Sequence, residues 1–174
     1  MSEIKKIIPF ITKAEGGFSN NKNDNGGATM RGITLNTFKN WRLKHGKEEP
    51  YVDDLKHISD DEWCDIVKTM YWNPWKADEI KNQSIANILV DFGFNSGVIS
   101  AIKWIQAYVL KVPSDGKIGP VSLAKINNAN QKELFEDIKD ARKEKYNLIV
   151  SKNPKQKVFL NGWMNRLNIY NYAE

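Results

Sequence analysis

The sequence predicts a mainly α-helical protein with one small loop or hairpin after its first helix. Apolar residues recur at helical spacing in almost every segment, as residues 4–11 and 85–92 illustrate. Glycine, asparagine and aspartate are concentrated near the N-terminal end, so short strands are expected only within residues 17–34. The length of 174 residues suits one domain, or one domain with a small appendage, and allows an ample core.

The first helix is predicted over residues 3–15. Its apolar stripe consists of Ile4, Ile7, Ile8 and Ile11. A further step of four residues leads to Glu15, and the glycine pair Gly16-Gly17 then ends the helix. Burial and the partial negative charge of a helix C-terminus both favour a protonated carboxyl, the form that a general acid needs. The alternative is that Glu15 is an ordinary exposed residue at a helix end.

The loop of residues 16–34 carries two further candidate catalytic side chains. The carboxylate of Asp24 follows Glu15 by nine residues, and the hydroxyl of Thr29 comes five residues later. Glycoside hydrolysis uses two carboxylates, one to protonate the leaving oxygen and one to act on water or the oxocarbenium-like sugar. The loop is therefore a candidate site for this chemistry, and a loop without a catalytic role is the alternative.

Two helices are predicted after the loop. Thr34 is the expected N-cap of the first, over residues 35–42, and residues 45–56 are irregular around a proline. Ser59 opens the second, because Glu62 follows it at the spacing of a capping box. The apolar face of this second helix contains Trp63, Ile66, Val67 and Met70.

An aromatic cluster, Tyr71-Trp72-x-Pro74-Trp75, follows that helix. Aromatic rings suit the apolar faces of pyranose sugars, so the cluster is a candidate sugar-binding wall. Ordinary core packing at a helix end is the alternative.

A strongly amphipathic helix is predicted around residues 85–92, and a mostly apolar one over residues 102–109. Asp91 and Asn95 lie four residues apart and therefore share a helix face. In a functional role they would line the floor of a cleft opposite Glu15. Capping and buried hydrogen bonding at a helix junction is the structural alternative.

A second cluster of turn residues occupies residues 112–120, where Gly119-Pro120 begins a new helix with proline at its first position. A long helix is predicted over residues 131–152, with its charged residues facing solvent. Its apolar stripe consists of Leu134, Ile138, Ala141 and Leu148. The side chains expected to pack the last element onto the body are Phe159, Trp163 and Leu167.

The composition excludes several function classes. The net charge is +5 and the isoelectric point is near 9.1, which favours polyanionic partners such as bacterial wall polymers or nucleic acid. No DNA-binding motif or phosphate-loop ending is present, so no nucleic-acid partner is expected. Cys64 is the only cysteine, which excludes an internal disulfide. The sequence has only two histidines, His45 and His57, so no zinc site or other cofactor is expected.

The loop sequence resembles the N-terminal signature of glycoside hydrolase family 108, through Glu15-Gly16-Gly17-Phe18 and Asp24-x-Gly26-Gly27-x-Thr29-x-x-Gly32-Ile33-Thr34. Members of this family are lysozyme-like N-acetylmuramidases, also known as secretion activator proteins. The spacing of Glu15 and Asp24 is also similar to that in phage-type lysozymes, with Thr29 one residue closer to Asp24. Phe18 departs from the family pattern, which has tyrosine there.

The resemblance implies roles for the loop residues. Glu15 would be the general acid, Asp24 would position water or stabilise positive charge, and Thr29 would orient the water. Gly26 and Gly27 would contribute to substrate binding. The implied fold is lysozyme-like.

Later segments resemble the family as well. They are Tyr71-Trp72, the stretch Asp91…Asn95-x-Gly97 and the closing Gly162-Trp163…Arg166. This part of the resemblance implies that Tyr71, Trp72, Asp91 and Asn95 contact substrate.

One further segment, Asp115-Gly116-x-x-Gly119-Pro120, is similar to a turn of small helical peptidoglycan-binding domains, with Ser122 where threonine is usual. The implied organisation is a lysozyme-like catalytic region over residues 1–96 and a helical peptidoglycan-binding region over residues 97–174, packed as one compact unit.

The expected function is hydrolysis of the β-1,4 bond between N-acetylmuramic acid and N-acetylglucosamine in peptidoglycan. A non-catalytic wall-binding or secretion-associated protein and a lytic transglycosylase are the alternatives. No apolar run approaches 18 residues and no signal peptide is evident. We therefore expect a protein made in the cytoplasm that reaches the cell wall after release by a holin, as prophage endolysins do, or by an export system.

Overall fold

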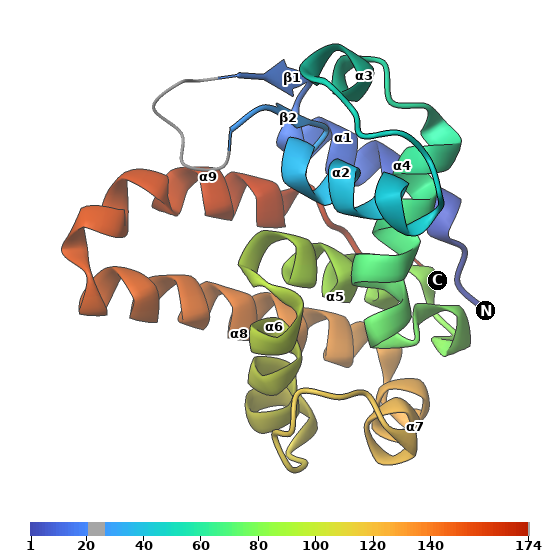
Figure 1. Cartoon of the computed structure of the whole chain (residues 1–174). Helices are drawn as coiled ribbons and strands as arrows, with labels where there is room; N and C mark the ends of the chain where they lie inside the picture. The colour runs from blue at the N-terminus through green and yellow to red at the C-terminus, as the bar shows by residue number, and fades with distance from the viewer. Residues whose placement is uncertain (21–26, 174) are drawn as a thin grey trace. The chain divides into compact units, whose positions relative to one another are not determined.

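The structure, a computed structural model, describes residues 1–20 and 27–173 (Figure 1). Asp24 and Gly26, two of the predicted site residues, therefore lie outside the described residues. The chain divides into two compact units. One unit comprises residues 7–70, and the other comprises residues 1–6 and 71–174.

The unit of residues 7–70 contains four α-helices and three short strands in its described part. In chain order these are α1 (Ile8–Glu15), β1 (Phe18–Ser19), β2 (Thr29–Met30), β3 (Ile33–Thr34), α2 (Leu35–Lys44), α3 (Val52–Lys56) and α4 (Asp60–Val67). The strands form one antiparallel sheet in the order β1-β2-β3. The fully buried side chains in the described part of this unit are Ile7, Ile11, Ile33, Phe38, Leu55, Trp63, Ile66 and Val67.

Local sequence signals account for the helix ends in this unit. The hydroxyl of Thr34 accepts a hydrogen bond from the Thr37 amide at the start of α2, and Ser59 caps α4 together with Glu62, as predicted. The predicted helix over residues 3–15 is interrupted, because a 3₁₀-helix (η1, Ile4–Lys6) precedes α1. Pro9 lies in the first turn of α1, where its missing N–H has no helical partner to lose.

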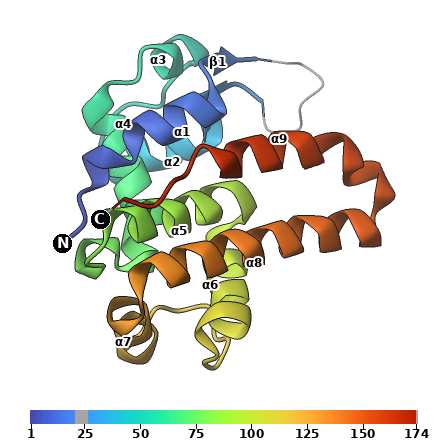
Figure 2. The ribbon, with the colours of Figure 1, turned by 180° about the vertical axis from the view of Figure 1, so that it is seen from behind.

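The second unit is helical throughout its described elements. Its α-helices are α5 (Gln83–Ser96), α6 (Val98–Ile105), α7 (Pro120–Asn128), α8 (Gln131–Lys152) and α9 (Lys157–Asn168). Short 3₁₀-helices occur at Asn73–Trp75 (η3), Ala77–Glu79 (η4) and Pro154–Gln156 (η6). π-Helical turns extend α4 at Lys68–Trp72 (η2) and α6 at Gln106–Leu110 (η5). Figures 1 and 2 both show α8 and α9 as an antiparallel pair with α5 beside α8.

Helix α5 forms the centre of this unit, because every residue from Ile85 to Gly93 is buried. Helix α8 has the predicted bounds, but its buried stripe differs from the predicted one. Leu148 is 38% exposed, while Arg142 and Tyr146 are buried. The buried face of α8 therefore follows the 3.6-residue period of an α-helix and includes the charged side chain of Arg142. The prediction placed all charged residues of this helix on its solvent face and did not anticipate a buried arginine.

The last helix and the second predicted helix each differ from expectation at one position. In α9, Leu167 is fully buried, whereas Phe159 is 54% exposed and stacks on Trp163 instead of packing onto the body. Met70 is also exposed, because the chain turns into the π-helical segment before its side chain can join the apolar face of α4. The predicted mainly α fold with a small hairpin after the first helix is confirmed.

Candidate functional site

Glu15 is the last residue of α1 and is half-buried. The helix ends there because Gly16 adopts φ +71°, a conformation that favours glycine, and its N–H donates to the carbonyl of Thr12. Apart from the glycine itself and its two chain neighbours, no heavy atom of the described residues lies within 4 Å of the position a Cβ would take at Gly16 or Gly17. The carboxyl-bearing helix end is therefore followed by backbone that a ligand can approach.

Thr29 lies in the same small sheet as the strand that follows Glu15. It pairs with Ser19 of β1 on one side and with Thr34 of β3 on the other. Ser19 follows Glu15 by four residues, so the strand pairing brings Thr29 beside the chain that leaves α1. Gly27, at φ +68°, precedes this strand and is exposed.

The turn between β2 and β3 fixes the hairpin to α4. Arg31 and Gly32 both have positive φ, at 47° and 76°, as a two-residue hairpin turn requires. Arg31 Nη1 donates to Asp60 Oδ1 at 2.7 Å, and the Trp63 indole N–H donates to the Arg31 carbonyl at 3.1 Å. The strand that carries Thr29 is thus held by contacts at its far end.

The aromatic cluster does not offer the predicted wall of three rings. Trp72 and Trp75 are fully buried, and Trp72 Nε1 donates to Asp78 Oδ1 at 2.8 Å. The prediction that Trp72 contacts substrate is not supported, because a ring without exposed surface cannot stack on a sugar. Tyr71 is half-buried against Phe94, with ring centroids 4.4 Å apart, and keeps part of its surface accessible.

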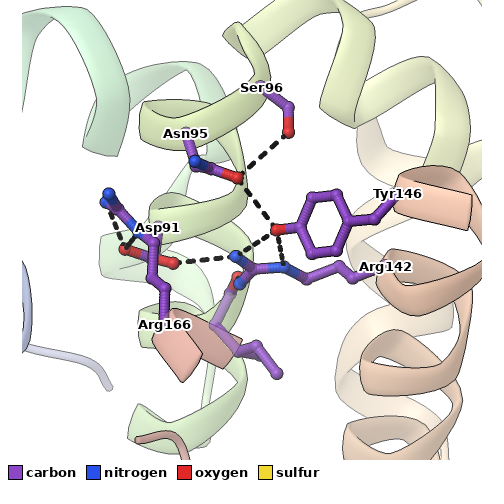
Figure 3. Close-up of polar contacts among 7 residues, drawn as sticks. Asp91, Asn95, Ser96, Arg142, Tyr146 and Arg166 are labelled. Carbon is purple, nitrogen blue, oxygen red and sulfur yellow. Dashed lines mark hydrogen bonds and ion pairs between the residues drawn. The ribbon is translucent and has the colours of Figure 1, made fainter. Parts of the chain in front are cut away.

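Asp91 is the centre of a buried ionic network (Figure 3). Its Oδ2 accepts from Arg142 Nη2 at 2.9 Å, and its Oδ1 accepts from Arg166 Nε and Nη2 at 2.9 and 2.7 Å. Arg142 also donates to the Ile88 carbonyl and to the Tyr146 hydroxyl. The network joins α5, α8 and α9 through side chains that are almost completely inaccessible.

The electrostatics of this network assign Asp91 a structural role. Burial alone would raise the pKa of Asp91, but Arg142 and Arg166 outweigh it and the pKa is lowered. The carboxylate is therefore charged and its exposed fraction is zero. The prediction that Asp91 contacts substrate is not supported, and the structural alternative accounts for its position.

Asn95 lies one helical turn beyond Asp91 and is half-buried. The Tyr146 hydroxyl donates to Asn95 Oδ1 at 2.9 Å, and Ser96 Oγ approaches the same oxygen at 3.5 Å (Figure 3). These contacts fix the amide orientation. Within residues 1–20 and 27–173, Asn95 Nδ2 donates to no acceptor, so both of its N–H groups remain available to a ligand.

Arg142 and Tyr146, which orient Asp91 and Asn95, were not identified from the sequence. A signal for them exists: Arg142 follows Ile138 by four residues and precedes Tyr146 by four, so it falls on the apolar stripe of α8. An isolated cation on one buried stripe and an isolated carboxylate on another predict an ion pair.

Neither a metal site nor a membrane span is found in the described chain. No group of three or more histidine, cysteine, aspartate or glutamate side chains among the described residues could hold a metal ion. No helix in residues 1–20 or 27–173 is long and apolar enough to cross a membrane.

Comparison with known proteins assigns the chain to a family. Residues 8–97 match the glycosyl hydrolase 108 family, and residues 100–168 match the Predicted Peptidoglycan domain. The chain belongs to the glycosyl hydrolase 108 family. A search of curated proteins found no match.

A solved structure extends the similarity over nearly the whole chain. Brucella abortus SagA superposes with a TM-score of 0.76 at 27% sequence identity, over 96% of this chain and 90% of that one. The mainly α, lysozyme-like fold class is confirmed, and the chain is a glycoside hydrolase with a C-terminal peptidoglycan-binding region. Peptidoglycan hydrolysis is the activity class that these family matches support. The predicted division between residues 96 and 97 stays a prediction.

Proposed function

We propose that this glycosyl hydrolase 108 protein is an N-acetylmuramidase in which Glu15 is the general acid. The observation that carries the proposal is the position of Glu15, the half-buried last residue of α1, inside the family match and followed by two open glycines. A carboxyl at this helix end can donate a proton to the glycosidic oxygen of a sugar chain lying over the glycines. The bond cleaved is the β-1,4 linkage between N-acetylmuramic acid and N-acetylglucosamine.

The remaining roles are proposed from the resemblance of the loop sequence to the family. Thr29, on the strand paired with Ser19, orients the attacking water. Asp24, which lies outside the described residues, acts on that water or stabilises the developing positive charge, and Gly26 and Gly27 line the substrate.

In the second unit, Tyr71 and Asn95 are the substrate-contacting residues that we retain. Tyr71 offers part of a ring face to a sugar. The oriented amide of Asn95 offers two donors, which suit the carbonyl oxygen of an N-acetyl group.

The test of the proposed acid is Glu15→Gln, which keeps the shape of the side chain and removes its acidic proton. We expect the turnover of purified peptidoglycan to fall by roughly 10²–10⁴-fold, with the melting temperature and binding to sacculi nearly unchanged. Glu48→Gln is the matched control, because Glu48 is an exposed residue of the same unit. Near-wild-type turnover by Glu15→Gln would refute the assignment.

Two other functions predict different products. A lytic transglycosylase would use Glu15 as its acid and base and would leave anhydro-muramic ends. A non-catalytic wall-binding protein would bind sacculi and release no new reducing ends. We also propose that the protein reaches the cell wall through a holin or an export system. Secretion of the protein by intact cells would favour export over lysis.

A further inference from the structure

A groove lies on the peptidoglycan-binding region, within the unit of residues 1–6 and 71–174. It is formed between α6, its π-helical extension and α8, and it encloses roughly 700 Å³, a volume in the usual range for ligand sites. We call it the Trp104 groove and define it by Ile99, Ser100, Lys103, Trp104, Tyr108 and Lys145. Figures 1 and 2 both show α6 crossing close to α8.

Two aromatic rings form one side of the Trp104 groove. Trp104 and Tyr108 are one helical turn apart, with ring centroids 4.1 Å apart and planes inclined by 33°. The Trp104 indole N–H donates to the Ala141 carbonyl of α8 at 2.7 Å, which holds the ring in place. Tyr108 is 49% exposed, so the pair presents a rigid aromatic surface to solvent. Such surfaces bind ligands that have an apolar face and polar edges, as pyranose rings do.

The ammonium group of Lys145 lies beside these rings. The Lys145 ammonium is 5.1 Å from the Trp104 ring centroid and donates to Ser100 Oγ at 2.7 Å. Within the described part of the chain it forms no ion pair, and burial lowers its pKa. A half-buried ammonium that has lost solvent and has no carboxylate partner gains most from an anionic ligand.

The turn that resembles those of small peptidoglycan-binding domains packs against two residues of this groove, and Ser114, directly before the turn, lines it. Gly116, at φ +80°, lies so close to Ile99 and Lys103 that an added Cβ would approach their side chains to 3.0 and 3.2 Å. Gln106 holds the turn by donating to Asp115 Oδ1 and to the Lys117 carbonyl and by accepting from the Gly116 amide. The Ser114 hydroxyl donates to the Lys103 carbonyl. A larger residue at position 116 would therefore be strained at this φ and would displace the side chains of Ile99 and Lys103 slightly.

We propose that the Trp104 groove is the site at which this region binds peptidoglycan, with a sugar ring on Trp104 and Tyr108 and a stem-peptide carboxylate at Lys145. The chemistry selects this ligand, because peptidoglycan carries N-acetylated pyranoses and free carboxylates within a few bonds of one another. The match of residues 100–168 to the Predicted Peptidoglycan domain covers all the defining residues except Ile99. The inference rests on the proposed function, since it names a second contact with the same substrate.

The experiment measures binding to purified sacculi, stripped of secondary anionic polymers, by co-sedimentation at 4 °C. Lys145→Met and Tyr108→Ala are compared with wild type, and Lys132→Met is the matched control, because Lys132 is an exposed lysine on the same helix. We expect each groove variant to bind about tenfold more weakly, as for the loss of one charge-assisted contact or one stacked ring, and the control to bind within about twofold of wild type.

Two further measurements separate this proposal from that of the active site. Turnover of a short soluble glycan is expected to be unchanged in both groove variants, because neither Lys145 nor Tyr108 has a role in the proposed reaction. We expect wild type to bind sacculi with chemically amidated carboxylates about tenfold more weakly than untreated sacculi. Lys145→Met is expected to bind the two kinds of sacculi equally.

The following results would overturn the proposed groove. The first is that both groove variants bind sacculi as tightly as wild type, and the second is that Lys132→Met loses as much binding as they do. The third is that the groove variants lose as much turnover of the soluble glycan as they lose binding. The fourth is that wild type binds amidated sacculi as tightly as untreated sacculi. Full activity of Glu15→Gln would instead refute the proposed general acid and leave the binding result standing.

Discussion

Two carboxyl groups of this protein, Glu15 and Asp91, have opposite environments. Asp91 has no exposed surface, and both of its oxygens accept hydrogen bonds from arginines on two other helices. Glu15 is half-buried at a helix end, with open backbone beside it. A carboxylate that is enclosed and neutralised by two arginines stabilises the fold and is unavailable to a substrate. A carboxyl beside open backbone can meet a sugar chain, so we assign the chemistry to Glu15.

This comparison predicts opposite signatures for variants of the two residues. Glu15→Gln is expected to remove activity and to keep stability, as described above. Asp91→Asn is expected to lower the free energy of unfolding by about 3–5 kcal/mol, because it leaves the buried Arg142 without its counter-ion. Urea unfolding checks this, with Asp137→Asn on the exposed face of α8 as the control. A loss below about 1 kcal/mol would remove the structural assignment of Asp91.

A smaller effect is expected at the other arginine of the network. Arg166→Met removes two hydrogen bonds to Asp91 Oδ1 but leaves the carboxylate paired with Arg142. The free energy of unfolding should therefore fall by roughly 1–3 kcal/mol, less than for Asp91→Asn. Parallel denaturant curves of the two variants test the order, and a reversed order would mean that Arg166 stabilises the fold mainly through contacts other than Asp91.

The dependence of stability on pH sharpens the comparison further. The pKa of Asp91 is lower in the folded protein than in the unfolded chain, where it is about 3.9. The ion pair therefore contributes its full stability above about pH 4, and this contribution is lost as the pH falls through the folded pKa. Asp91→Asn should show a shallower decline in stability between about pH 4 and pH 2 than wild type. Identical slopes in the two proteins would contradict the lowered pKa.

Much of the fold could be predicted from the sequence because its signals are local. The caps at Thr34 and Ser59, the proline that begins α7 and the bounds of α8 depend on residues within one or two turns of one another. Short strands occur only within the predicted loop among the described residues. The interrupted first helix and the exposure of Leu148 and Phe159 were not predicted, because they depend on which surfaces the neighbouring elements cover.

Of the predicted site residues, some are accessible in the structure and others are buried. Glu15 and Thr29 came from a contiguous pattern, and both lie in the same small unit. Trp72 and Asp91 share their residue types with sugar-binding sites, yet both are buried. The buried pairing of Asp91 depends on a partner far away in the chain, since Arg142 is 51 residues from it. Pattern and residue type therefore identified candidates, and only tertiary contacts showed which of them are buried.

The most direct test of the proposed function is the chemistry of the glycan ends produced from purified peptidoglycan. Wild type should generate reducible N-acetylmuramic acid ends, identified by mass spectrometry, and Glu15→Gln should generate none. Anhydro-muramic ends would contradict hydrolysis and indicate transglycosylation at the same residue. The absence of any new ends from wild type, with binding to sacculi retained, would contradict catalysis altogether.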